Sequence, residues 1–323
     1  MIKAGIIGGA GYTAGELLRI LVNHPEVELG FVHSESNAGN ALCDVHEGLI
    51  GDTDMIFSDR YDLDSVDVLF LCSGHGKSEA FWKENRMPST LKVIDLAQDF
   101  RDEHDGYVYG LPEWQRSRIA GASRIANPGC FATCIQLALL PLAAAGKLCS
   151  EINVTAITGS TGAGVKPGAT THFSWRDNNL SAYKVFEHQH LIEINRDLRL
   201  IQDSGDVSFP PINFVPVRGD FPRGIFATVH TDCDLSEEDA VKLYKEYYED
   251  AAFTFVSDKA VDLKQVVNTN KCIVHVEKHA GKIVITSVID NLLKGASGQA
   301  VQNMNLAFGF DETAGLKLKA SAF

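Results

Sequence analysis

The sequence predicts an α/β protein with an N-terminal doubly wound parallel sheet and an inserted α+β domain whose sheet is mostly antiparallel. Three observations predict this fold. A strand, a glycine turn and an amphipathic helix open the chain, and short apolar strands then alternate with helices. Beyond residue 130 the strands become longer, and two of them are separated only by the turn HAG.

Composition limits the functions that this chain can have. Its 323 residues carry a formal net charge of −13, and an acidic balance argues against a nucleic-acid partner. The sequence has no apolar run of about 18 residues and no signal-peptide pattern, so we expect a cytoplasmic protein without a membrane partner. Seven cysteines without a CxxC pair fit a reducing compartment, and we expect no metal site.

The first strand and helix enclose a glycine-rich turn, in which Gly8, Gly11 and Ala14 fit the pattern G-x-x-G-x-x-A. Glycines at such a turn let the backbone approach a pyrophosphate, which then sits on the helix N-terminus. A tight turn without a ligand is the alternative. The position of the motif between strand and helix favours a dinucleotide site of the Rossmann type.

The tips of the next two strands supply further candidate cofactor residues. The segment VELGFVHSES ends in Ser34, Glu35 and Ser36. An NAD enzyme usually places a carboxylate there for the ribose 2′-hydroxyl, but Glu35 lies late for that role. The two serine hydroxyls can accept a 2′-phosphate, which favours NADP. The strand DVLFLCSGHG leads into a loop with Ser73 and Gly74, which we expect to flank the cofactor.

The segment ANPGCFATC, residues 126–134, places Cys130 between a Gly/Pro turn and an apolar helix. A helix N-terminus favours an anion, so Cys130 is a candidate thiolate with a lowered pKa. A buried structural cysteine is the alternative. Cys134 lies one helical turn further along, where the apolar surroundings should bury its thiol and raise its pKa.

The second half contains a pair of histidines just ahead of a predicted helix. His188 and His190 precede that helix, and Glu193 falls in its first turn. Histidine passes protons near neutral pH, and a carboxylate such as Glu193 can fix its tautomer. No cysteine or carboxylate cluster at zinc-like spacing accompanies the pair. Two exposed loop histidines are the alternative.

The C-terminal segment DNLLKGASGQAVQNMNLAFGF ends a strand and enters a predicted helix from about Ala296 to Phe308. We expect this helix to fold back onto the first domain. The cofactor domain would then comprise residues 1–129 with about 295–323, and residues 130–294 would form an inserted catalytic and oligomerisation domain.

Eight segments spread over the whole chain resemble one family. They are GAGYTAGELLRIL (9–21), SNAG (36–39), VIDLAQDFR (93–101), YGLPE (109–113), ANPGCFAT (126–133), GSTGAG (159–164), EHQHLIEI (187–194) and DNLLKGASGQAVQNMNLAFG (290–309). In this order they resemble the N-acetyl-γ-glutamyl-phosphate reductases, within the wider aspartate-semialdehyde dehydrogenase superfamily.

The resemblance implies roles for particular residues. Cys130 matches the nucleophile, and His188 and His190 match the pair that supplies the acid or base, without showing which of the two acts. The implied substrate and phosphate residues are Arg101, Asn127 and Arg223. The implied NADP(H) contacts are Gly8, Ala10, Gly11, Tyr12 and Thr13 in the first loop, and Asn291, Gly295 and Gln299 near the C-terminus.

The family resemblance also implies a reaction and an oligomeric state, and two alternative functions stay open beside it. The reaction is NADPH-dependent reduction of an N-acyl-γ-glutamyl phosphate, an acyl phosphate, to its semialdehyde through a cysteine thioester, in arginine biosynthesis. A homodimer or homotetramer is expected. The stretch NFVPVRGDFPRGIFATV is longer than the family's common pattern, which leaves the acyl group open between acetyl and succinyl. The alternatives are an aspartate-semialdehyde dehydrogenase-like enzyme and a non-catalytic NADP-binding sensor.

Overall fold

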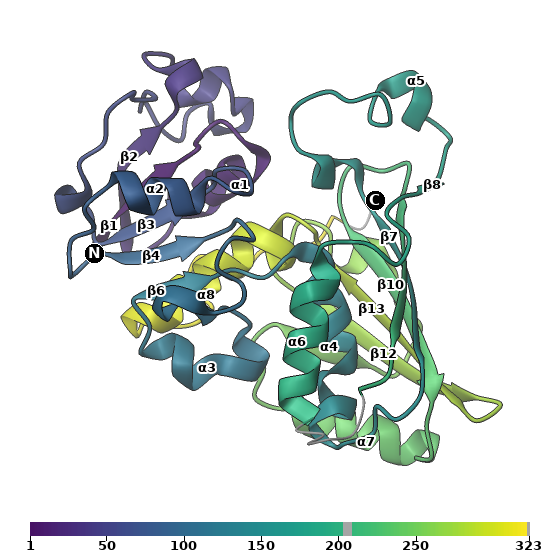
Figure 1. Ribbon diagram of the computed structural model, residues 1–323. Helices are drawn as coiled ribbons and strands as arrows, with labels where there is room; N and C mark the ends of the chain where they lie inside the picture. Colours follow the sequence, from purple (N-terminus) through teal and green to yellow (C-terminus); the bar gives the residue numbers. More distant parts are fainter. Residues whose placement is uncertain (203–208, 322–323) are drawn as a thin grey trace. The chain divides into compact units, whose positions relative to one another are not determined.

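The chain, described for residues 1–202 and 209–321 in a computed structural model, forms two compact units (Figure 1). Unit 1 comprises Met1–Pro128 and Ala296–Leu318. Unit 2 comprises Gly129–Gly295 and the segment from Lys319 onward. The first domain was expected to extend to residue 323, but the segment from Lys319 falls in unit 2, and residues 322 and 323 lie outside the described part.

Unit 1 is built on a six-stranded sheet in the order β2-β1-β3-β4-β6-β5, and every neighbouring pair is parallel. The strands are β1 (Ile2–Ile7), β2 (Val27–His33), β3 (Val68–Leu71), β4 (Lys92–Asp95), β5 (Val108–Tyr109) and β6 (Arg124–Ala126). All four residues of β3 are buried, as expected for a strand covered on both faces. The predicted doubly wound parallel sheet is confirmed.

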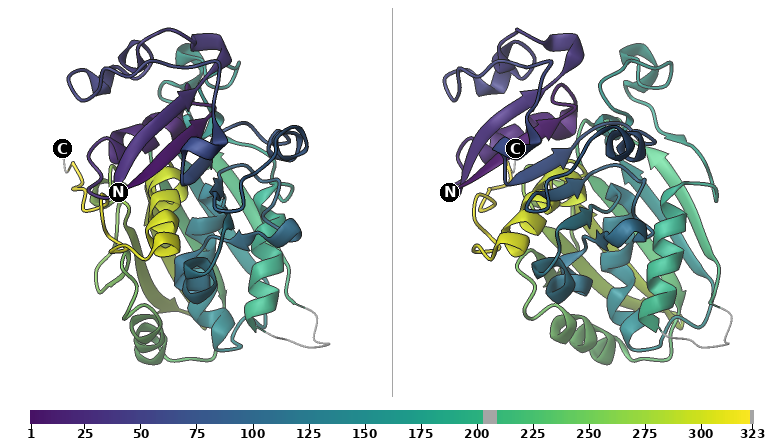
Figure 2. Two further views of the ribbon diagram at one scale, coloured as in Figure 1. Left: turned by 90° about the vertical axis from the view of Figure 1, so that its left-hand side faces the viewer. Right: turned by 60° about the vertical axis from the view of Figure 1, so that its left-hand side comes forward.

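Four helices belong to unit 1: α1 (Tyr12–Leu21), α2 (Ser78–Glu84), α3 (Pro112–Ala120) and α8 (Gly298–Phe308). Helix α8, drawn in yellow, packs against α1, α3 and β4 (Figure 2). Its buried polar residues form hydrogen bonds within this unit. Asn303 Nδ2, for example, donates to the Gly110 carbonyl at 2.9 Å. The C-terminal helix therefore completes the packing of unit 1.

The last helical segment begins earlier than the sequence predicted. A π-helical turn, Leu293–Ser297, precedes α8, so the helical backbone starts three residues before the expected Ala296. The cause is Asp290, whose Oδ1 accepts the backbone N–H groups of Leu292 and Leu293 at 2.8 and 3.1 Å. This carboxylate satisfies donors that would otherwise be left open at the start of the turn.

Unit 2 contains a seven-stranded mixed sheet in the order β11-β12-β13-β10-β7-β9-β8. Its strands are β7 (Ile152–Thr158), β8 (Ser181–Ala182), β9 (Ile212–Arg218), β10 (Ile225–Asp232), β11 (Thr254–Ser257), β12 (Cys272–His279) and β13 (Lys282–Ile289). Only the β7–β9 and β11–β12 pairs are parallel. The predicted, mostly antiparallel second sheet is confirmed.

Helices α4 (Cys130–Ala144), α6 (His190–Gln202) and α7 (Glu237–Tyr247) pack on this sheet (Figure 1). A short helix, α5 (Phe173–Arg176), precedes β8 in the chain. Helix α4 is buried from Phe131 to Ala143, which explains why its sequence is apolar apart from Thr133 and Gln136. Within the described residues, none of the helices combines the length and apolar character that a membrane span requires.

Candidate active site

The start of α4 presents Cys130 as the sequence predicted. The helix begins at Cys130, with three residues between it and the end of β6, and the preceding Gly129 is extended, with φ −69° and ψ 151°. Gly129 has no side chain to cap the first turn, and no acidic residue lies in that turn. The thiol of Cys130 is half-buried, which is compatible with access by a substrate. A helix N-terminus stabilises an anion that develops beside it, so the position suits a thiol nucleophile.

Two glycines allow this close packing around Cys130. A Cβ on Gly129 would stand 2.5 Å from His190 Nε2 and 2.7 Å from Glu193 Oε1. A Cβ on Gly295 would stand 2.8 Å from the Cβ of Cys130. Gly295 was expected to contact the cofactor, and in the structure its backbone packs directly on the candidate nucleophile. Neither position has room for a larger residue.

The start of α6 contributes the other predicted catalytic residues. Helix α6 begins at His190, and His188, His190 and Glu193 are all buried. The two imidazole rings lie edge to face with centroids 4.6 Å apart. Glu193 Oε2 accepts the backbone N–H of Gly129 at 3.1 Å, a contact that the sequence did not predict. The structure therefore brings Cys130, His188, His190 and Glu193 together within unit 2.

The surroundings of His188 define its protonation state. Its Nδ1 accepts the backbone N–H of His190 at 3.2 Å, so the neutral ring carries its proton on Nε2. Burial, together with the charges of Lys184 and Arg218, lowers the pKa of His188 to about 4. Glu193 was expected to fix a histidine tautomer; for His188 a backbone N–H does so. His188 is thus a neutral hydrogen-bond donor at pH 7.

Tyr183 and Arg218 extend this cluster, although neither was singled out from the sequence. The Tyr183 ring lies edge-on to His188, 5.8 Å between centroids, and the Arg218 guanidinium stands over the Tyr183 ring at 4.6 Å. Burial raises the pKa of Tyr183 to about 12, the charge of Cys130 adds to this effect, and Arg218 opposes it. The sequence feature that could have drawn attention to Arg218 is the unusual stretch PVRG, which ends β9.

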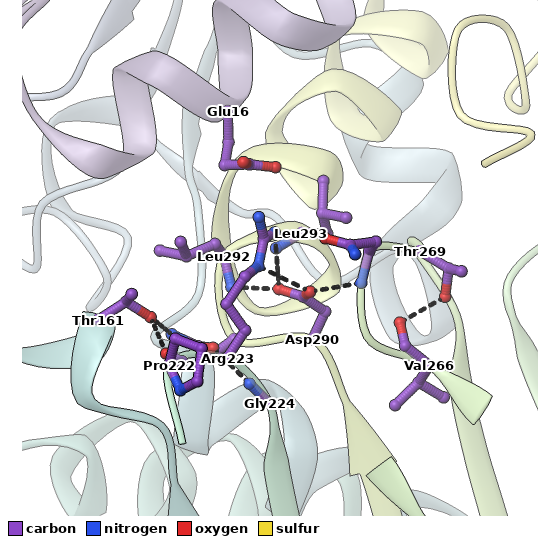
Figure 3. A network of polar contacts seen from close by, with 12 residues as sticks. Glu16, Thr161, Pro222, Arg223, Gly224, Val266, Thr269, Asp290, Leu292 and Leu293 are labelled. Atoms are coloured by element: carbon purple, nitrogen blue, oxygen red, sulfur yellow. Dashed lines mark hydrogen bonds and ion pairs between the residues drawn. The ribbon is translucent and has the colours of Figure 1, made fainter. Parts of the chain in front are cut away.

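Arg223 belongs to a separate polar network around Asp290 (Figure 3). Its Nε and Nη2 donate to the two oxygens of Asp290 at 3.0 and 3.1 Å. Asp290, fully buried, also accepts the backbone N–H of Asn268. The side chain of Asn291 binds the Gly224 N–H and the Thr161 hydroxyl, at 2.7 and 3.0 Å. Asp290 thus fixes Arg223 and the turn that carries Gly295, a function that sequence patterns do not reveal.

The glycine turn of unit 1 has the backbone that a dinucleotide requires. Gly8 has φ +82°, and a Cβ there would stand 2.9 Å from the carbonyl carbon of Cys72. Gly11 is the N-cap of α1, its backbone is extended, and it provides no side-chain cap for the helix. The first N–H groups of α1 are therefore suited to bind an anion. The predicted contacts Ala10, Tyr12 and Thr13 lie in the same turn. These residues fit a bound pyrophosphate.

The serine candidates differ in their accessibility. Ser34 is buried and Ser36 is exposed, and both hydroxyls accept from the side-chain amide of Asn37, at 3.3 and 3.0 Å. Gly74 is exposed and Ser73 is half-buried. The end of their loop is held by Asp99, which accepts the backbone N–H groups of Gly76 and Ser78, at 2.7 and 2.9 Å.

Arg101 and Asn127 belong to one buried network of unit 1. Arg101 Nε donates to the Asn127 carbonyl at 2.9 Å, and the Asn127 amide donates to the Ala296 carbonyl at 3.0 Å. The Asn127 Oδ1 accepts from Asn303. Gln299 is fully buried on α8. These contacts hold the turn between β6 and α4 in place.

No group of three or more histidine, cysteine or acidic side chains is arranged to hold a metal ion in residues 1–202 and 209–321. All seven cysteines are free thiols.

Comparisons with solved structures reveal the same fold. Aspartate semialdehyde dehydrogenase II from Vibrio cholerae matches 96% of this chain and 98% of its own, with a TM-score of 0.71 and 20% sequence identity. A probable aspartate-semialdehyde dehydrogenase from Pseudomonas aeruginosa matches 95% of this chain and 98% of its own, with a TM-score of 0.73 and 17% identity.

Sequence comparisons identify the family. Residues 3–122 match the semialdehyde dehydrogenase NAD binding domain, and residues 130–291 match the semialdehyde dehydrogenase dimerisation domain. The N-acetyl-γ-glutamyl-phosphate reductase of Phocaeicola vulgatus is 59% identical over 326 residues, and that of Azobacteroides pseudotrichonymphae is 60% identical over 327 residues. Both alignments cover 100% of each chain. The chain therefore belongs to the N-acetyl-γ-glutamyl-phosphate reductases of the semialdehyde dehydrogenase family.

Proposed function

We propose that this chain reduces an N-acyl-γ-glutamyl phosphate, with acetyl as the acyl group, to the N-acyl-glutamate 5-semialdehyde and phosphate, with NADPH as the reductant. One observation carries the proposal: a half-buried cysteine opens α4 in the same unit where two histidines and a glutamate open α6. Relatives at about 59% identity bear the name of this reaction. The aspartate-semialdehyde dehydrogenases share only the fold, so a glutamyl substrate is favoured over an aspartyl one.

Covalent catalysis explains why a cysteine is needed. The Cys130 thiolate attacks the acyl carbon, the carbon–oxygen bond to phosphate breaks, and phosphate leaves with the electron pair. The resulting thioester on Sγ is a better hydride acceptor than a carboxylate. Hydride addition gives a thiohemiacetal, which releases the aldehyde and restores the Cys130 thiolate.

The cofactor domain supplies the reductant. Bound NADPH provides the hydride that reduces the thioester. The turn from Gly8 to Thr13 would hold its pyrophosphate, because Gly11 is extended at the helix start and a Cβ there would have no atom nearer than 3.9 Å. The exposed hydroxyl of Ser36 supports a preference for the 2′-phosphate of NADP over NAD. Comparing kcat/KM for the two cofactors tests this preference.

The two histidines have different roles in this proposal. His188 donates its Nε2 proton as a hydrogen bond to the oxyanion that develops on the acyl carbon, because its Nδ1 is occupied by a backbone N–H. His190 exchanges the catalytic proton, with Glu193 close to its ring. Removing both imidazoles should slow turnover by about 10²- to 10⁴-fold, the usual range for general acid–base catalysis.

A homodimer or homotetramer formed through unit 2 completes the proposal. Residues 130–291 match a dimerisation domain, and along β10 and β12 buried residues alternate with half-buried ones such as Phe226, Thr228 and Ile273. A sheet face with these residues gains stability when a second copy covers it. Light scattering at micromolar concentration should report a multiple of the 35.2 kDa chain.

The direct test is the reverse reaction. The purified protein receives N-acetylglutamate 5-semialdehyde, NADP⁺ and phosphate, and NADPH formation is followed by its absorbance. We expect phosphate-dependent turnover. A protein that binds NADPH but turns over neither this aldehyde nor aspartate semialdehyde would be the non-catalytic sensor instead.

A further inference from the structure

Two buried polar atoms of unit 2 lack a hydrogen-bond partner among the residues that the structure describes, and the mechanism above uses neither. They are Arg218 Nε and Thr158 Oγ1. The two residues pair across adjacent parallel strands, since Thr158 ends β7 and Arg218 ends β9 in the same register. A buried donor without a partner is costly, which favours a ligand group as the partner.

The position of this pair points toward the candidate nucleophile. Side chains alternate along a strand, so Arg218 shares a face with Phe214 of the same strand. Phe214 packs on Phe131, the residue that follows Cys130, with ring centroids 5.1 Å apart. The orphan atoms of Thr158 and Arg218 therefore lie at the strand ends on the same face of the sheet as the start of α4.

Arg218 differs from two other arginines of unit 2 in its polar partners. Arg176 donates to three backbone carbonyls and the Ser181 hydroxyl, and Arg223 forms a paired contact with Asp290. Arg218 stacks on Tyr183 and forms a side-chain hydrogen bond with it, but its Nε has no partner. Within the described part of the chain, Arg218 forms no ion pair with a carboxylate. Arg218 is half-buried as a residue, but its Nε is buried. A guanidinium without a counter-charge favours a carboxylate in a planar, paired contact.

We propose that Arg218 and Thr158 form a carboxylate subsite that holds the substrate with its acyl carbon toward Cys130. The proposal rests on the proposed function for the identity of the substrate. Such a substrate offers an α-carboxylate, and an acyl group such as succinyl offers a second one. The guanidinium binds the carboxylate and the Thr158 hydroxyl donates to it. The subsite thus selects acidic acyl phosphates over neutral ones.

The test measures KM in the reverse reaction for Arg218→Met, Thr158→Val and the wild type. Losing a charge-assisted hydrogen bond should raise KM for N-acetylglutamate semialdehyde about 10- to 100-fold in Arg218→Met. Thr158→Val should raise it about 3- to 10-fold, because one neutral hydrogen bond is lost. KM for phosphate and for NADP⁺ should stay unchanged. Arg218→Lys, which keeps the charge, should recover part of the loss.

Lys184→Met is the matched control. Lys184 and Arg218 both lower the pKa of His188 by their charge, but Lys184 is bonded to Gln189 outside the strand-end pair. If Arg218 acted only on His188, Lys184→Met would change the kinetics in the same way. We expect Lys184→Met to leave KM for the aldehyde at its wild-type value.

Modified substrates distinguish the two carboxylates. If Arg218 binds the α-carboxylate, replacing that carboxylate by a carboxamide should raise KM for the wild type and leave KM for Arg218→Met unchanged. If it binds a carboxylate on the acyl group, the wild type should prefer N-succinyl to N-acetyl substrate, and Arg218→Met should lose that preference. Equal discrimination by both proteins in both comparisons, or a KM change confined to phosphate, would overturn the subsite.

Calorimetric binding of N-acetylglutamate separates this proposal from the proposed function. Binding that depends on Arg218 in a protein that turns over no semialdehyde would retain the subsite and refute the function. Normal turnover with unchanged KM and unchanged binding in a folded Arg218→Met would refute the subsite alone. Thermal unfolding of each variant establishes that it is folded.

Discussion

Two strand–turn–helix junctions of this chain share a backbone and differ in their chemistry. The turn after β1 ends in Gly11 and the turn after β6 ends in Gly129, and both glycines are extended N-caps without a side-chain cap. In the first, the residues around the helix start are small or exposed. In the second, His190 and Glu193 stand against the glycine. The same helix N-terminus therefore suits a bound phosphate in one place and a thiolate in the other, and the neighbouring side chains decide which.

The largest expected effect comes from removing the thiol at the second junction. Cys130→Ser should lower kcat by about 10⁴-fold or more, because a serine hydroxyl at this position remains protonated and a poor nucleophile. NADPH affinity should be nearly unchanged, since the glycine turn of unit 1 is intact. Steady-state kinetics and a fluorescence titration with NADPH measure the two quantities. Near-normal turnover would refute every role assigned around Cys130.

The first junction is tested by two glycine substitutions. Gly8→Ala should lower the free energy of unfolding by about 1–3 kcal/mol, because its φ of +82° is strained for alanine and the new Cβ meets the Cys72 backbone. Gly11→Ala is the control, with φ −84° and no atom nearer than 3.9 Å. It should fold normally and weaken NADPH binding, if a pyrophosphate approaches the turn. Unchanged NADPH affinity in both variants would contradict the cofactor site.

The histidine beside the second junction should make stability depend on pH. Burial lowers the pKa of His188 to about 4, so the unfolded chain binds a proton below its ordinary pKa of about 6.5 and the folded chain does not. Stability should therefore fall as pH drops from about 6.5 toward 4. His188→Asn should flatten this dependence in urea unfolding, and the exposed His172→Asn should not. A wild-type profile that His188→Asn leaves unaltered would contradict the neutral, buried imidazole.

The smallest effect belongs to the second cysteine of α4. Burial raises the pKa of the Cys134 thiol well above its usual value, and its Sγ donates to the Ser287 carbonyl at 3.3 Å. Cys134→Ser should cost about 1 kcal/mol of stability and leave kcat near the wild-type value. Iodoacetamide at pH 7 should label Cys130 first. Preferential labelling of Cys134 would reverse the comparison between the two turns of this helix.

Periodicity predicted most of the fold, and its failures have physical causes. The strands β12 and β13, which flank the turn HAG, alternate or run apolar and were predicted from that pattern. Strand β9 was missed, because Pro216 lies inside it and proline argues against a sheet interior. The Pro216 carbonyl accepts the Tyr183 N–H, at 3.1 Å. The early start of the C-terminal helical segment depends on Asp290, a contact invisible to local patterns.

Local sequence patterns predicted only part of the candidate active site, for the same reason. The turn before Cys130 and the histidine pair lie in short, distinctive segments that local sequence identifies. The contact of Glu193 with the Gly129 N–H and the pairing of Thr158 with Arg218 join residues about 60 positions apart, as the strand register and helix packing require. Such contacts follow from the folded sheet rather than from a motif.

Trapping the acyl-enzyme tests the central claim most directly. The protein is incubated with N-acetylglutamate semialdehyde and NADP⁺ without phosphate, so that the thioester forms and cannot be released by phosphorolysis, and its peptides are then analysed by mass spectrometry. The account predicts an N-acetylglutamyl adduct on the peptide that contains Cys130, absent from Cys130→Ser and lost when phosphate is added. An adduct on another cysteine, or turnover without any adduct on Cys130, would contradict it.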